Sequence, residues 1–419
     1  MTARRYVLAL DQGTTGSTAL VVDPDGAVRG RGYAELPQRF PRAGWVEHDP
    51  EEIWQTTCQA LARALGAARV SSSEVLAVGI ANQRETAILW ERASGRPVHN
   101  AIVWQCRRTA ALCEALKAEG AEPEFREKTG LILDPYFSGT KIRWVLDEVP
   151  GARARAERGE LAFGTVDAWL LWRLSGGAVH ATDPSNASRT LCFNIRTLDW
   201  DEGLCRRLGV PTSVLPRVLP SAGVFAETAA GVLPGGIPVT GIAGDQQAAL
   251  FGQACVEPGT AKNTYGTGCF ALLNTGQTPV GSTRGLVTTV AWTVGHRTSY
   301  ALEAIAYQSR DVLDTMAEES GLPIRALRVD GGAAVNDFLC QFQSDILGAE
   351  VLRPSVTEIT GLGAAYLAGV GVGLWKTEDL AGRWKLERRF TPALMPAARE
   401  AAYAGWRRAV ERSRAWAQP

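Results

Sequence analysis

The stretch YVLALDQGTTGSTALVVDPDG, residues 6–26, gives the strongest indication of the fold. An apolar run at 6–10 is followed by a turn rich in glycine and threonine at 11–17 and by a second apolar run at 19–22. Apolar runs bounded by such turns are typical of β-strands. We therefore predict a β-meander whose first turn presents backbone N–H groups and hydroxyls.

This pattern returns in the second half of the chain. The stretch GTAKNTYGTGCFALLNTG, residues 259–276, again places a Gly-Thr turn between two strand-like runs. A third glycine-rich turn, at 330–333, follows an apolar run at 327–329. The similarity is short, but it predicts two halves of like architecture that face each other.

Strands and helices alternate along the rest of the sequence, which is typical of an α/β fold. A Gly/Pro-rich stretch at 235–238 precedes a new strand, so we place a domain boundary there, between residues 1–235 and 236–419. Apolar spacing predicts further strands at 75–80, 86–90 and 239–243 and helices from about 50, at 138–148, 166–177, 305–316, 335–347 and 397–416.

Composition limits the possible partners. The 44 Lys and Arg residues balance the 44 Asp and Glu residues, so no net charge attracts nucleic acid or an anionic membrane. A chain of 419 residues is long enough for two domains with a ligand cleft between them. We therefore expect small-molecule partners.

The eight cysteines include no C-x-x-C pair, and the four histidines are not clustered at metal-ligand spacing. No signal-peptide pattern and no run of eighteen apolar residues occurs. These features predict a cytoplasmic protein with free thiols, no structural zinc site and no membrane span. The oligomeric state stays open, a homo-oligomer included.

The three glycine-rich turns are candidate phosphate sites, because backbone N–H groups without bulky side chains can approach phosphate oxygens closely. Thr14, Thr15 and Thr267 add hydroxyl donors. There is no P-loop and no protein-kinase glycine loop. Asp11 opens the first turn, where its carboxylate either orients a hydrated Mg²⁺ or simply starts an Asx turn.

Asp245 and Gln246 follow the strand at 239–243 and begin a helix. Helix N-capping is one interpretation of Asp245. The other is a general base, since ligands of open α/β sheets bind at the carboxyl ends of strands.

Arg84 and Glu85 lie in NQRET, between two apolar runs. On an exposed hairpin tip this pair would carry no function. In a cleft it would offer hydrogen-bond donors and acceptors to a triol, and Trp104 and Phe270 would pack against the carbon edge of that triol.

At these residues the chain resembles the glycerol kinases, a branch of the FGGY carbohydrate kinases. The segments that carry the resemblance are ALDQGTTGS, GIANQRET, AIVWQCRRT, LDPYFSGTKIRWVLD, TDPSNASRTLCFNI, GIAGDQQAALFGQ, NTYGTGCF, RVDGGAAVND and TGLGAAYLAG. The resemblance implies two ribonuclease-H-like, actin-like domains that close on Mg·ATP and a substrate.

The resemblance also implies roles for individual residues. By it, glycerol contacts Arg84, Glu85, Tyr136, Asp245 and Gln246. The implied reaction is ATP-dependent formation of glycerol 3-phosphate in glycerol catabolism, with Asp245 as the base that accepts the proton of the glycerol hydroxyl. The residues that would contact the nucleotide, ATP or ADP, are Thr14, Thr15, Ser17, Thr267, Gly332 and Asn336.

Three departures from the family pattern stand out. Thr18 replaces an arginine near the first phosphate turn, and no arginine-bearing loop of the kind that binds fructose 1,6-bisphosphate precedes Ile237. After Glu303 the family continues for several tens of residues, whereas Ala304 follows directly here. The missing part carries family contacts to ATP, so we expect a shortened second domain.

Two alternatives to a glycerol kinase remain open. One is a kinase for another polyol or a ketose, against which the Arg84–Glu85 pair argues. The other is a catalytically impaired remnant that still binds glycerol.

Overall fold

The computed structural model describes residues 4–231, 233–265, 269–305 and 309–413, and its main feature is a sheet of thirteen strands. In the order in which they are hydrogen bonded, the strands are β21 (Leu386–Phe390), β20 (Glu350–Pro354), β19 (Ala326–Asp330), β15 (Ala261–Tyr265), β16 (Cys269–Gly276), β18 (Arg297–Ile305), β17 (Val287–Val294), β13 (Ala222–Glu227), β14 (Pro238–Gly244), β5 (Val75–Asn82), β1 (Tyr6–Gln12), β2 (Gly16–Val22) and β3 (Val28–Glu35).

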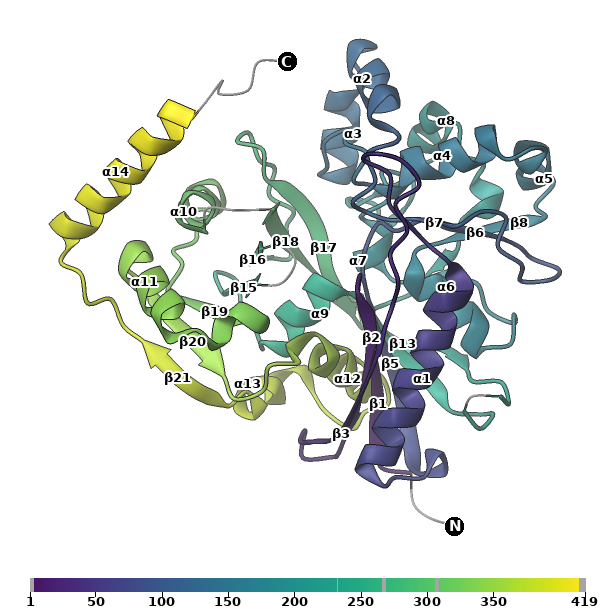
Figure 1. Ribbon diagram of the computed structural model, residues 1–419, viewed down its shortest axis with the longest axis horizontal. Coiled ribbons are helices and arrows are strands. Elements are labelled where there is room, and N and C mark those ends of the chain that lie inside the picture. The colour runs from purple at the N-terminus through teal and green to yellow at the C-terminus, as the bar shows by residue number, and fades with distance from the viewer. Residues whose placement is uncertain (1–3, 232, 266–268, 306–308, 414–419) are drawn as a thin grey trace.

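The two ends of this sheet have the same topology, as the repeated sequence pattern predicts. In the first half β1 pairs antiparallel with β2 and parallel with β5, and β14 continues the parallel set. In the second half β15 pairs antiparallel with β16 and parallel with β19, and β20 continues the parallel set. Figure 1 shows the second half, with α10, α11 and α14, on the left and the first half on the right.

Helices flank the strands of the sheet, and a further group of helices lies at the upper right of Figure 1. They are α1 (Pro50–Ala68), α2 (Ala110–Ala118), α3 (Glu122–Thr129), α4 (Ser138–Glu148), α5 (Ala152–Glu157), α6 (Val166–Leu174), α7 (Pro184–Ala187), α8 (Glu202–Leu208), α9 (Asp245–Gly252), α10 (Ser309–Ser320), α11 (Asp337–Leu347), α12 (Ile359–Gly371), α13 (Leu380–Arg383) and α14 (Pro396–Ser413). Within the described residues no helix is both long and apolar enough to cross a membrane.

Four two-stranded sheets complete the first half. They pair β4 (Glu47–His48) with β7 (Ala101–Ile102), β6 (Ile88–Glu91) with β8 (Leu161–Gly164), β9 (Ala181–Thr182) with β12 (Arg217–Val218), and β10 (Phe193–Asn194) with β11 (Asp199–Trp200).

The segment around the predicted gap differs from the sequence-based expectation. A helix was expected from Ile305, but strand β18 runs through Ile305 and helix α10 begins at Ser309. Ala304 and Ile305 extend the pairing of β18 with β16. The ladder hydrogen bonds of a neighbouring strand thus outweigh the local helical pattern at this point.

The predicted domain boundary falls within the continuous sheet. Strand β14 begins just after that boundary, yet it pairs in parallel with β5 of the first half. The division at residues 235 and 236 therefore stays a prediction.

Helix α12 packs closely against the sheet and against α9 because glycines stand at the contact. A Cβ atom on Gly79 of β5 would lie 2.1 Å from the carbonyl oxygen of Ala364, and one on Gly363 would lie 1.8 Å from that of Ala248. Both neighbours are backbone atoms, which cannot rotate away. This close approach fixes α9, which carries Asp245 at its first residue, against the strands.

We predict that Gly363→Ala lowers the free energy of unfolding by about 1–3 kcal/mol, because the new methyl group overpacks this contact. Urea unfolding measures the effect. Gly66→Ala is the matched control, since a Cβ atom there meets nothing within 4 Å and alanine favours a helix. Equal stability of the two variants would contradict the packing argument.

Candidate active site

A pocket of about 190 Å³ lies where the parallel strands of both halves end. Asp11 is near the carboxyl end of β1, Arg84 and Glu85 follow β5, and Asp245 follows β14. Thr264 comes from the end of β15 in the other half. Because the carboxyl ends of parallel strands meet at one edge of a sheet, the fold itself gathers these side chains.

Most of the predicted site residues line this pocket. Its lining residues are Asp11, Gly13, Thr14, Thr15, Arg84, Glu85, Trp104, Tyr136, Asp245, Gln246, Thr264, Phe270 and Thr360. The Arg84–Glu85 pair is therefore not on an exposed hairpin tip, since Arg84 is 3% and Glu85 1% exposed.

Four residues predicted to contact the nucleotide are not among them. The hydroxyl of Ser17 is buried and forms a hydrogen bond of 3.0 Å with Thr56 Oγ1. Gly332 starts the 3₁₀ turn Gly332–Val335, and Asn336 caps helix α11 by accepting a hydrogen bond from the Leu339 N–H. Thr267 lies outside the described residues.

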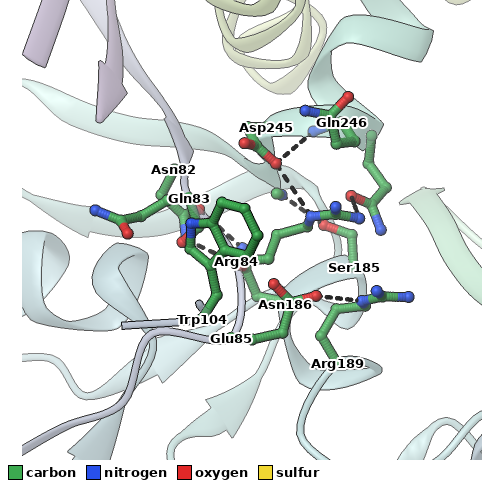
Figure 2. A network of polar contacts seen from close by, with 12 residues as sticks. Asn82, Gln83, Arg84, Glu85, Trp104, Ser185, Asn186, Arg189, Asp245 and Gln246 are labelled. Carbon is green, nitrogen blue, oxygen red and sulfur yellow. Dashed lines mark hydrogen bonds and ion pairs between the residues drawn. The ribbon is translucent and has the colours of Figure 1, made fainter. Parts of the chain in front are cut away.

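Arg84 is held on several sides. Its two terminal nitrogens donate to the two carboxylate oxygens of Glu303, both at 2.8 Å, and its Nε lies 3.0 Å from Asp245 Oδ1. Figure 2 shows the guanidinium of Arg84 directed at Asp245 and that of Arg189 directed at Glu85. The orientation of Arg84 is thus fixed before any substrate enters.

Arg189 closes the same network. Its Nε donates to Glu85 Oε1 at 2.6 Å, and its Nη1 lies 3.1 Å from Glu303 Oε2. Burial by itself would raise the pKa of Glu303, but the Arg189 and Arg84 guanidinium groups lower this pKa to about 2. Glu303 is therefore an anion throughout the physiological pH range.

Asp245 differs from its neighbours in being accessible. Its side chain is 26% exposed, whereas that of Arg84 is 2% exposed. The expected N-cap role is not what the structure shows, because Gly244 is the N-cap of α9 and Asp245 is its first residue. Asp245 Oδ1, the oxygen that lies near Arg84 Nε, also accepts a hydrogen bond of 2.7 Å from the Gln246 N–H.

Aromatic rings form the apolar wall of the pocket. The Trp104 ring packs edge to face on Tyr136 at 5.7 Å and on Phe270 at 6.2 Å between ring centroids. The indole N–H of Trp104 donates to Thr14 Oγ1 at 2.9 Å. This bond ties the wall to the first glycine-threonine turn.

Asp11 is a half-buried residue whose carboxyl group lies near other carboxylates. Burial, together with the nearby Asp245 and Asp330 carboxylates, raises its pKa to about 7. Among the described residues no group of three His, Cys, Asp or Glu side chains is close enough to hold a metal ion alone. A cation that keeps water and phosphate ligands, as Mg²⁺ does, fits this charge pattern.

Sequence profiles of the FGGY family of carbohydrate kinases match this chain twice. The profile of the family's N-terminal domain matches residues 6–252, which is more than half of the chain, and that of its C-terminal domain matches residues 295–372. The chain belongs to the FGGY family of carbohydrate kinases.

Similar proteins include curated glycerol kinases. That of Symbiobacterium thermophilum is 50% identical and covers 98% of this FGGY kinase and 99% of its own length. That of Carboxydothermus hydrogenoformans is 47% identical, with 99% coverage of both chains.

Solved structures confirm the predicted two-domain α/β fold. Plasmodium falciparum glycerol kinase with ADP has a TM-score of 0.91 at 27% identity and 100% coverage of both chains. Lactobacillus acidophilus gluconate kinase has a TM-score of 0.84 at 15% identity, covers 98% of each chain, and shows likeness of fold alone.

The alignments also show that this FGGY kinase is shorter than its relatives. The alignment with the Symbiobacterium protein runs over 492 positions, whereas this chain has 419 residues. The relatives therefore contain residues that have no counterpart here. The predicted position of the gap, after Glu303, lies inside the region that the C-terminal profile matches.

Several residues of the site were not predicted from the sequence. Thr264 and Thr360 line the pocket, and Glu303 and Arg189 hold its charged groups. Glu303 follows the apolar run YAL in a strand that is buried on both faces. Without alternation of apolar and polar residues, the sequence gave no sign of the face on which the Glu303 side chain lies. A charged residue inside such a run was the only available signal.

The backbone of Glu85 is strained and is held by a buried lysine. Glu85 has a φ of +61°, in the left-handed region that non-glycine residues rarely adopt. Lys141 Nζ donates to the carbonyl oxygens of Glu85 at 3.3 Å, of Phe137 at 3.2 Å, and of Tyr136. Burial lowers the pKa of Lys141 to about 8, so this ammonium group depends on its carbonyl partners.

We predict that Lys141→Met lowers the free energy of unfolding by about 3 kcal/mol or more, because three carbonyl oxygens lose a buried donor. Chemical denaturation measures the change. Lys128→Met is the control, since Lys128 is half-buried at the surface and its pairs with Glu124 and Asp201 are worth about 1 kcal/mol or less. Equal losses in the two variants would contradict the anchoring role.

Proposed function

We propose that this FGGY kinase transfers the γ-phosphoryl group of ATP to glycerol and forms glycerol 3-phosphate and ADP. The observation that carries the proposal is the small pocket in which an oriented arginine and two carboxylates oppose an aromatic wall. A triol needs such a combination of several polar groups and one apolar face. The 50% identity to a protein named glycerol kinase, over nearly the whole chain, supports glycerol in particular.

In this proposal Arg84 and Glu85 hydrogen-bond the hydroxyls of glycerol, and its carbon chain lies along Trp104 and Phe270. The hydroxyl that reacts points to Asp245, whose partly exposed side chain lines the pocket. Arg84 stays paired with Glu303 while it donates to the substrate. Gln246 and Tyr136 complete the polar lining.

The chemical step moves one proton and one phosphoryl group. The glycerol oxygen attacks the γ-phosphorus of ATP, its proton passes to Asp245, and the bond between the γ-phosphorus and the bridging oxygen breaks with its electron pair leaving on ADP. Gly13, Thr14 and Thr15 line the pocket next to Asp11, where backbone N–H groups and hydroxyls can stabilise the phosphate charge. For the rest of the nucleotide we propose Gly332, Asn336 and Thr267, whereas the buried hydroxyl of Ser17 bonds Thr56 inside the protein.

A bound Mg²⁺ would neutralise phosphate charge, with Asp11 as its proposed protein partner, directly or through water. The raised pKa of Asp11 beside other carboxylates supports a cation at this position. We also propose two features of the whole chain. They are two domains that meet near residues 235 and 236, and a cytoplasmic location, with which the eight free cysteines agree.

A second candidate function is a catalytically impaired kinase that binds glycerol. The difference between 419 residues and an alignment of 492 positions favours it. The glycerol pocket takes most of its lining from residues 11–270, whereas the proposed gap follows Glu303. A loss there would weaken ATP binding more than glycerol binding.

The proposal predicts that a coupled ADP-release assay gives a higher specificity constant for glycerol than for xylulose, ribulose or gluconate. Longer substrates would clash with the pocket or leave its buried polar groups unpaired. Asp245→Asn should lower kcat by about 10²–10⁴ while calorimetry still detects glycerol binding.

Asp199→Asn is the control for this assay, because Asp199 is exposed and lies outside the pocket. Near-normal turnover of Asp245→Asn would remove Asp245 as the base. Equal specificity constants for glycerol and a ketopentose would assign the chain to another substrate.

The segment that is missing after Glu303 leads to a separate prediction. Inserting the corresponding segment of the Symbiobacterium relative between Glu303 and Ala304 should lower the Kd for ATP and raise the thermal midpoint, with little change in the Kd for glycerol. Calorimetry with each ligand and thermal unfolding measure these effects. If the original chain already binds ATP as tightly as the relative does, the impaired-kinase alternative is wrong.

A further inference from the structure

We propose that Glu303 is a positioning residue for the substrate site, and that it sets the affinity for glycerol by holding Arg84. This inference rests on the proposed function. It adds a residue that does not line the pocket and that belongs to strand β18, directly before the proposed gap.

The geometry restricts how Glu303 can act. Its carboxylate is fully buried and has a two-pronged contact with the guanidinium of Arg84, at 2.8 Å on each side. The Nε of Arg84 then points to Asp245, and one terminal nitrogen lies 3.5 Å from the Tyr136 hydroxyl. The direct contacts of Glu303 with the site therefore run through Arg84 and through the Arg189–Glu85 pair.

Charge explains why this hold is needed. Without Glu303, Asp245 and Glu85 would be the remaining carboxylates near the Arg84 and Arg189 guanidinium groups. Arg84 would turn its terminal nitrogens toward Asp245, the more accessible carboxylate. Those nitrogens could then no longer donate to the hydroxyls of glycerol. Asp245 would also be less free to accept a proton.

Stability alone does not account for this arrangement. Removing two guanidinium and two carboxylate groups from water carries a large desolvation penalty, and buried ion pairs are often no more stabilising than apolar residues of similar size. Glu303, Arg84, Arg189 and Glu85 nevertheless all lie at or below 3% exposure. The orientation of Arg84 in the pocket is a benefit that apolar residues could not supply.

The test is Glu303→Gln, which keeps the shape of the side chain and removes its charge. Calorimetry on the full chain should show the Kd for glycerol raised by about 10- to 100-fold, since a charge-assisted pair is lost. The Kd for ATP should stay within about twofold. A protein that is only destabilised would bind both ligands more weakly. A raised Kd for glycerol with a nearly unchanged Kd for ATP therefore identifies a positioning role for Glu303.

Glu47→Gln is the matched control, because Glu47 forms a comparably buried pair with Arg108, at 2.6 Å, away from the pocket. It should leave both dissociation constants unchanged, whatever its thermal midpoint. A second comparison uses Arg84→Ala. In that background Glu303→Gln should have a much smaller effect on glycerol affinity, because only the contact through Arg189 and Glu85 remains.

The inference is overturned if Glu303→Gln binds glycerol as the unchanged chain does, if it loses glycerol and ATP alike, or if it weakens glycerol binding equally with and without Arg84. Failure of the proposed function is seen separately, in the unchanged chain, as absence of glycerol binding and of ADP release.

Discussion

The pocket of this FGGY kinase depends on one buried group of charges, in which Glu303 bridges Arg84 and Arg189 and Arg189 holds Glu85. These four residues come from the loop after β5, the segment after α7 and strand β18. Burying any one of these charged groups alone would carry a large desolvation cost. Here each charge is paired with a neighbouring charge of opposite sign. The consequence is that the groups expected to contact glycerol are oriented by contacts that join both halves of the chain.

The sheet explains why these residues can meet. Both halves repeat the same order of strands, and Asp11, Arg84, Asp245 and Thr264 all lie at carboxyl ends of parallel strands or directly after them. Glycines at the contact with α12 let this helix and α9 approach the strands, which fixes the start of α9 and hence Asp245. Asp245, the proposed base, is thus placed by backbone packing, whereas Arg84 is placed by charge.

Much of this was readable from the sequence because it follows from local patterns. The turn at 11–17 and its counterpart at 259–276 predicted the paired halves, and the Arg84–Glu85 and Asp245–Gln246 pairs predicted the polar side of the pocket. Glu303, Lys141 and Arg189 act through contacts across 56 to 219 positions of sequence, which no local pattern encodes. Strand β18 was missed at Ile305 for the same reason, since its partner β16 is remote.

The account is tested most directly by a crystal structure of this chain with glycerol and ADP, from crystals that contain no other polyol. It predicts glycerol in the pocket, with hydroxyls within hydrogen-bonding distance of Arg84 and Asp245, and with Arg84 still paired to Glu303. Glycerol bound elsewhere, or an Arg84 side chain turned away from Glu303 in the complex, would contradict it.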